Sequence, residues 1–144
     1  MEASVVSPIC FENTDFETEV LPPPGFYEAT VCSARFRQST QGNLMLHVIF
    51  ELHGVVAPND HVADYFVLEG APRAVTVARG RVVRLYRACG LSPQQGDEIS
   101  PADLFSSRLE VKVDHDEWRG RPRLRVLACR PRTAAQERSD STPF

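Results

Sequence analysis

The sequence predicts a mainly β fold, in which five strands and one helix form a single small domain. Three observations lead to this expectation. Five stretches carry apolar side chains at alternate positions or are rich in β-branched and aromatic residues, which is typical of strands. One stretch has apolar side chains at helical spacing. Glycine and proline stand at the points where these stretches meet. At 144 residues, the chain is long enough to bury a core without metal or disulfide support.

The first two strands follow an acidic, proline-rich arm that we place at residues 1–24. Three prolines and a glycine in LPPPG (21–25) exclude a helix there. The next stretch, FYEATVCSARFR (26–37), has strand composition, and LMLHVIFEL (44–52) alternates with Leu46, Val48 and Phe50 on one face. A turn containing Gly42 joins them, so we expect a β-hairpin.

The third strand and the helix come next. In HVADYFVL (61–68), Asp64 shares a face with apolar residues. Residues 74–89 have apolar side chains at helical spacing, and Gly90 stands where a helix-ending glycine belongs. A very short helix is expected in SPADLF (100–105), with Ser100 as its N-cap.

The last two strands are predicted at RLEVKVDH (108–115) and RLRVLAC (123–129), with Leu124, Val126 and Ala128 facing inward. DEWRGRP (116–122) connects them, and VDHDE (113–117) is interpreted as part of a polar hairpin loop. Three strands, a helix and a two-stranded hairpin follow the element order of an OB-fold, a five-stranded Greek-key barrel with one helix between the third and fourth strands. The predicted OB-fold domain covers residues 25–130, and residues 131–144 form a flexible tail.

Charge is strongly segregated along the chain, although the formal net charge is only -3. Residues 1–72 carry ten acidic and two basic side chains, whereas residues 73–132 carry thirteen basic and seven acidic ones. Such an asymmetry is expected when one face of a protein meets a polyanion.

Two stretches resemble a phage-associated family, formerly a domain of unknown function, whose members are similar to OB-fold single-stranded-DNA-binding proteins. They are LPPPGFYEATVCSARFRQSTQGNLMLHVIFELHG (21–54) and RVVRLYRACGL (81–91), and the similarity extends over residues 21–130. The sequence departs from the family pattern at APND (57–60), where the family has a glycine, and at Arg37, where it has lysine. The residues that match the pattern are Gly25, Tyr27, Thr40, Gly42, Glu51 and Gly54, with Arg37 at the basic position.

The resemblance implies binding of single-stranded DNA with little sequence preference, in phage or bacterial replication, recombination or repair. Single strands are held by cations along the phosphate backbone and by aromatic rings on which bases stack. We expect Phe36 to lie in the core and the helix arginines Arg79, Arg81, Arg84 and Arg87 to be solvated, away from DNA. The candidate nucleic-acid-binding residues are Arg35, Arg37, Tyr65, Lys112, Trp118, Arg119, Arg121, Arg123 and Arg125. Of these, Arg119 and Arg121 are placed in a turn, and Arg123 and Arg125 on an outward strand face.

No catalytic, metal-binding or cofactor residue is predicted. The sequence has no phosphate-binding glycine loop, no nucleophile elbow and no paired zinc ligands, and its four cysteines lie far apart. Asp114, His115, Asp116 and Glu117 are consecutive, and neighbouring residues of a strand point to opposite faces, so joint metal ligation requires a tight turn. A nuclease or hydrolase using these acids is therefore the least favoured hypothesis.

A protein-interaction module with no nucleic-acid role remains the alternative function, because arginines also bind acidic protein surfaces. Pro143 and Phe144 end the chain as in bacterial single-stranded-DNA-binding proteins, whose tails dock replication or recombination proteins, and a disordered terminus is the alternative. A homo-oligomer is left open. The apolar runs are too short for a membrane span and the acidic start is unlike a signal peptide, so we expect a cytoplasmic protein.

Overall fold

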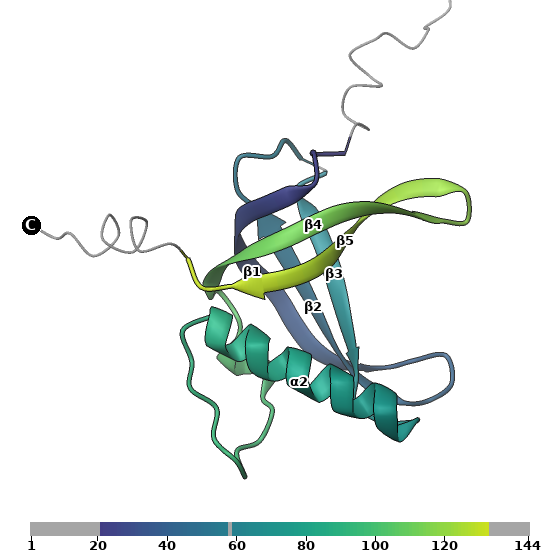
Figure 1. Cartoon of the computed structure of the whole chain (residues 1–144), viewed down its shortest axis with the longest axis vertical. Coiled ribbons are helices and arrows are strands. Elements are labelled where there is room, and N and C mark those ends of the chain that lie inside the picture. The colour runs from purple at the N-terminus through teal and green to yellow at the C-terminus, as the bar shows by residue number, and fades with distance from the viewer. Residues whose placement is uncertain (1–20, 58, 133–144) are drawn as a thin grey trace, which may run out of the picture.

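A computed structural model describes residues 21–57 and 59–132 and contains five strands, one α-helix and one short 3-10 helix (Figure 1). The predicted arm up to residue 20 and the tail from residue 133, with Pro143 and Phe144, lie outside the described residues. The elements in chain order are β1 (Gly25–Gln38), β2 (Leu44–Leu52), β3 (His61–Val67), α2 (Pro72–Ala88), η1 (Pro101–Asp103), β4 (Arg108–Trp118) and β5 (Arg121–Arg130).

The strands form one antiparallel sheet in the order β3-β2-β1-β4-β5, which confirms the predicted mainly β fold, with one α-helix among the described residues. The sheet bends so that the hairpin of β4 and β5 passes in front of β1, β2 and β3, and α2 lies across one end (Figure 1). Among the described residues, β3 and β5 are the edges of this sheet and form no ladder with each other. The sheet is therefore not closed into a barrel by hydrogen bonds.

The core lies inside this bend and uses the alternation that the sequence shows. Leu46, Val48 and Phe50 of β2 are almost fully buried, as are the β4 residues Leu109 and Val111. Burial of each such side chain contributes about 1.5–3 kcal/mol to folding. The sheet therefore has an apolar inner face and a more polar outer face.

Helix α2 begins two residues earlier than predicted, at Pro72, a residue whose fixed φ suits the first helical turn. Its buried residues include Ala78, Val82 and Leu85, as the spacing predicts. Gly90 has a φ of 85° and follows the helix as the expected left-handed residue. None of the helices in the described part of the chain is long and apolar enough to cross a membrane.

A β-bulge in β1 changes which side chains face inward. The pairing with β2 shifts between Val31 and Ser33, so one extra residue enters β1 at this point. Beyond the bulge, Phe36 stands opposite the buried Leu46 and so shares the inner face, whereas Phe26 lies on the outer face. The expected burial of Phe36 was wrong: it lies at the end of the strand and is 42% exposed.

A second bulge, in β5, contradicts part of the prediction that Leu124, Val126 and Ala128 all face inward. Lys112 pairs with Ala128 but Val113 pairs with Val126, so Leu127 is the extra residue. Beyond it the alternation is reversed, and Ala128 is exposed while Cys129 packs against the core. The prediction for Ala128 was wrong because alternation cannot be counted through a bulge.

Candidate nucleic-acid interface

Three side chains from neighbouring strands form a row on the outer face of the sheet. His47 of β2 lies directly opposite Arg35 of β1 on one side and Tyr65 of β3 on the other. Residues opposite each other in antiparallel strands project from the same face. The imidazole of His47 and the ring of Tyr65 are stacked, with centroids 4.5 Å apart and planes inclined by 6°. Tyr65, which is 47% exposed, therefore presents an aromatic face held in place by a buried ring.

Two arginines of β1 lie on the side of His47 away from Tyr65. Nη1 of Arg37 lies 3.5 Å from Nδ1 of His47. Burial of His47, together with the charges of Arg37 and Arg35, lowers the pKa of its imidazole. His47 is thus held in the neutral form at neutral pH, and the positive charge comes from the guanidinium groups. We call Arg35, Arg37, His47 and Tyr65 the Tyr65 surface.

The β4–β5 hairpin is longer and its turn tighter than predicted. The strands extend to Trp118 and from Arg121, which leaves only Arg119 and Gly120 between them. Both turn residues have positive φ, 53° and 77°, as a tight two-residue hairpin turn requires. The predicted loop over 113–117 and the placement of Arg121 in a turn were therefore wrong. The sequence feature that was overlooked is Gly120, which lies between two stretches of similar length and marks a tight hairpin turn.

The tip of this hairpin carries Trp118, which is 52% exposed. The guanidinium carbon of Arg119 lies 4.3 Å from the centre of the tryptophan ring, and that of Arg123 lies 6.0 Å from it. These are cation–π distances. The tip thus combines an exposed aromatic ring with positive charge.

The arginines of β5 face acidic side chains of β4. Arg123 binds Asp116 through two contacts, Nε to Oδ1 at 2.8 Å and Nη2 to Oδ2 at 3.4 Å. The hydrogen bond from Arg123 lowers the pKa of Asp116. Arg125 stands directly opposite Asp114 in the register. The outward face of the hairpin is therefore a surface of alternating charge, although Arg123 and Arg125 do face outward as predicted.

Arg123 also connects the hairpin to the Tyr65 surface. The hydrogen bond to Asp116 raises its pKa, and ionisation of the nearby Tyr65 hydroxyl would raise it further. Tyr65 and Arg123 therefore lie near each other, on the two edge strands β3 and β5. The structure brings Arg35, Arg37, Tyr65 and Arg123 to one side of the molecule.

Lys112 belongs to a different group of side chains. Its Nζ lies 5.9 Å from the centre of the Phe26 ring, and the guanidinium carbon of Arg130 lies 3.5 Å from the same ring. Nε of Arg130 donates a hydrogen bond of 2.6 Å to Oε1 of Glu110. Lys112 therefore lies with Phe26 and Arg130, and not with the Tyr65 surface.

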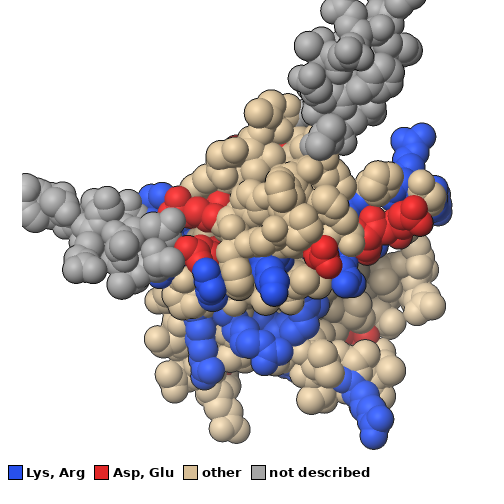
Figure 2. Space-filling view, turned by 45° about the horizontal axis from the view of Figure 1, so that its top comes forward, with Lys and Arg blue, Asp and Glu red and all other residues tan. Residues whose placement is uncertain are grey.

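The two edge strands and α2 enclose a groove of about 140 Å³, lined by Asp64 and Phe66 of β3, Arg81 and Arg84 of α2, and residues 126–129 of β5. Arg81 forms an ion pair with Asp64 and lies over the Phe66 ring. Burial raises the pKa of Asp64, and Arg81 opposes that shift. The expectation that all helix arginines are solvated was thus wrong for Arg81. Figure 2 shows Lys and Arg gathered in the middle of one face.

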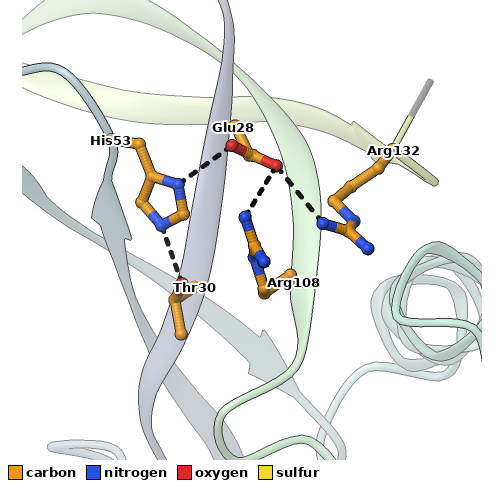
Figure 3. Close-up of polar contacts among 5 residues, drawn as sticks. All are labelled: Glu28, Thr30, His53, Arg108 and Arg132. Atoms are coloured by element: carbon orange, nitrogen blue, oxygen red, sulfur yellow. Dashed lines mark hydrogen bonds and ion pairs between the residues drawn. The ribbon is translucent and has the colours of Figure 1, made fainter. Parts of the chain in front are cut away.

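A separate polar cluster ties the end of β5 to β1 (Figure 3). Oε1 of Glu28 lies 3.1 Å from Nδ1 of His53, and Oε2 lies 3.2 Å from Arg108 and 3.5 Å from Arg132. Nε2 of His53 is 2.8 Å from the hydroxyl of Thr30. Burial alone raises the pKa of Glu28, but His53 and the two arginines outweigh it and the net shift is downward. These contacts hold three other chain segments, at His53, Arg108 and Arg132, to one carboxylate of β1.

The acids and the histidine at 113–117 point to opposite faces of β4, as strand alternation predicts. Asp114 and Asp116 pair with arginines on the outward face, while His115 pairs with Leu124 and lies 2.7 Å from the carbonyl oxygen of Pro22. Burial raises the pKa of Cys89 and Cys129 to about 11, so both thiols stay protonated at neutral pH.

Comparison of the chain with models of known protein families gave no match, and comparison with curated proteins gave none either. The resemblance to the phage-associated family therefore stays a prediction. His47 is the residue of this surface that the sequence reasoning missed. Alternation in the second predicted strand already placed His47 on the outward face. The sequence did not show that His47 lies opposite Tyr65, because that depends on the register between the two strands.

Proposed function

We propose that this protein binds single-stranded DNA with little sequence preference, as a non-enzymatic component of phage or bacterial DNA replication, recombination or repair. The observation that carries this proposal is the Tyr65 surface, where a half-exposed ring is stacked on His47 among arginines. A base stacked on an aromatic side chain contributes about 1–3 kcal/mol, whatever its identity. Arg35 and Arg37 lie on β1, on the other side of His47 from Tyr65, and would meet the phosphates of a strand that crosses this face.

We further propose that the sheet is an OB-fold barrel left partly open between β3 and β5. In a five-stranded OB-fold barrel with this strand order, each strand is hydrogen-bonded to two neighbours. The sheet described here has all of these pairings except the one between the edge strands β3 and β5. Both edges line the groove that α2 covers, so they lie near each other. OB-folds bind oligonucleotides on the face of their second and third strands, flanked by the first and last hairpins. The Tyr65 surface and the Trp118 hairpin have these positions in the chain.

The candidate residues would then divide into two groups. Arg35, Arg37 and Tyr65 form the centre, and the hairpin residues Trp118, Arg119, Arg121, Arg123 and Arg125 extend the contact. Arg123 must exchange Asp116 for phosphate, so its contribution is smaller than that of a free guanidinium. Lys112 is the member with the weakest support, because it lies beside Phe26.

A protein-interaction role is the second candidate. The observation that favours it is the alternating charge of the hairpin, in which Arg123 and Arg130 already have carboxylate partners. Such a surface suits a partner protein of mixed charge better than a polyanion. In that case the Tyr65 surface would be a contact for an apolar or aromatic side chain.

A titration of the full-length protein with oligo-dT separates the two candidates. Its tryptophan fluorescence and its mobility in a native gel are followed at low and moderate salt. DNA binding predicts quenching of Trp118, a mobility shift and an affinity that falls steeply with salt. The absence of both signals at low salt would reject the DNA proposal and leave the protein-interaction role.

A further inference from the structure

A second group of side chains on the outer face of the sheet lies where β2 ends and β3 begins. Glu51 of β2 stands directly opposite His61, the first residue of β3, and Asp60 precedes His61 in the turn. One oxygen or nitrogen atom from each of these three residues lies within 4.8 Å of the others. We call Glu51, Asp60 and His61 the Glu51 cluster.

The charge of this cluster is poorly balanced by the protein. Asp60 is only 8% exposed, yet among the described residues its carboxylate forms one side-chain hydrogen bond, with Nδ1 of His61 at 2.8 Å from Oδ1. Within residues 21–57 and 59–132, no lysine or arginine forms an ion pair with Asp60 or Glu51. Keeping two carboxylates together, one of them buried, costs free energy unless a cation lies between them.

The Glu51 cluster carries two carboxylates, in contrast to the arginine-rich Tyr65 surface on the same sheet. His47 and Tyr65 stand four residues along β2 and β3 from Glu51 and His61, which separates the two groups by about 13 Å.

We propose that the Glu51 cluster binds a divalent transition-metal ion of the zinc and manganese class. Two carboxylates and one imidazole are hard and borderline ligands that suit Zn²⁺ and Mn²⁺, whereas Mg²⁺ and Ca²⁺ prefer sites made of oxygen alone. Asp60 lies in a turn, so it and His61 escape the strand alternation that separates Asp114 from His115. The hydrogen bond to Asp60 holds the imidazole beside the carboxylate.

The test is a calorimetric titration of the tag-free, full-length protein with Zn²⁺, after treatment with a chelator and removal of that chelator. We expect one equivalent to bind. Glu51→Gln and Asp60→Asn should each weaken binding by about tenfold or more, because even groups that merely support a metal ligand are worth about 10–100-fold. His53→Gln is the matched control, since His53 also pairs with a carboxylate but lies outside the cluster, and it should bind Zn²⁺ like the native protein.

Three results would overturn the proposal. They are no stoichiometric binding by the native protein, unchanged binding by Glu51→Gln, and loss of binding in His53→Gln alone. Glu51 is exposed, so its substitution keeps the test valid if Asp60→Asn fails to fold. A large excess of Mg²⁺ should leave Zn²⁺ binding unchanged, and displacement by Mg²⁺ would refute the assigned class of ion. No DNA is present, so these outcomes are independent of the proposed function.

Discussion

Replacing Tyr65 by alanine is the sharpest test of the proposed DNA surface. One face of the Tyr65 ring is covered by His47, so a single base can stack on the face that remains. Loss of one stacked base costs about 1–3 kcal/mol. Because each 1.4 kcal/mol is tenfold in affinity, the dissociation constant for oligo-dT should rise by about 5- to 150-fold. Tyr65→Phe keeps the ring and should bind nearly as well as the native protein.

The salt dependence distinguishes the role of Tyr65 from that of its arginine neighbours. Fluorescence anisotropy of a labelled oligo-dT is measured across about 50–200 mM salt, where phosphate contacts change affinity strongly. Tyr65→Ala removes no charge, so its slope of log affinity against log salt should equal that of the native protein. Arg35→Ala should flatten the slope by about 0.7, the value for one phosphate contact on a single strand.

Phe105→Ala is the matched control, because Phe105 is an exposed aromatic residue that follows η1, away from the Tyr65 surface. It should leave both affinity and slope unchanged. The reasoning is refuted if Tyr65→Ala, folded by circular dichroism, binds oligo-dT as tightly as the native protein. An equal loss of affinity in Phe105→Ala would also refute it, since the effect would then be unspecific.

Three further predictions concern charged side chains. Asp116→Asn should strengthen oligo-dT binding at low salt because it releases Arg123, and anisotropy measures the gain; weaker binding would contradict this account. Arg81→Ala leaves Asp64 buried without its cation, so urea denaturation should show a loss of stability that shrinks at acidic pH, where Asp64 is protonated; a loss independent of pH would point to packing instead. The folded-state pKa of Glu28 is lowered, so its stabilisation is present above the unfolded value of 4.5 and is lost as pH falls through the folded pKa. Glu28→Gln should therefore be less stable than the native protein at pH 7 and approach it in acid, as thermal melts at several pH values would show.

Much of the fold could be predicted from alternation alone. The apolar face of β2 was identified correctly, because Leu46, Val48 and Phe50 follow a strict period of two. The helix was found from its spacing and from Gly90. The bulges at Cys32 and Leu127 could not be found in this way, since an extra residue interrupts the period without a glycine or proline to mark it.

The candidate site was predictable in its composition and less so in its arrangement. Tyr65, Arg35 and Arg37 were selected as exposed cations and an aromatic ring on strands. The stacking of His47 on Tyr65 depends on the register between β2 and β3, which a single sequence does not specify. The pairing of Arg123 with Asp116 was missed for the same reason, because the tight turn at Arg119 sets which residues of β4 and β5 face each other.

The position of β1 at the centre of the sheet has a consequence for how the chain folds. This strand is the first of the described elements, yet one of its edges pairs with β4, so that Gly25 meets Val113 and Ala29 meets Leu109. Contacts between residues so distant in sequence are slow to form. During synthesis, the edge of β1 stays without its partner until the second half of the chain has been made. The sheet can therefore form on both sides of β1 only after β4 has been synthesised. A chain that ends before Arg108 would leave one edge of β1, the central strand, without a hydrogen-bonding partner.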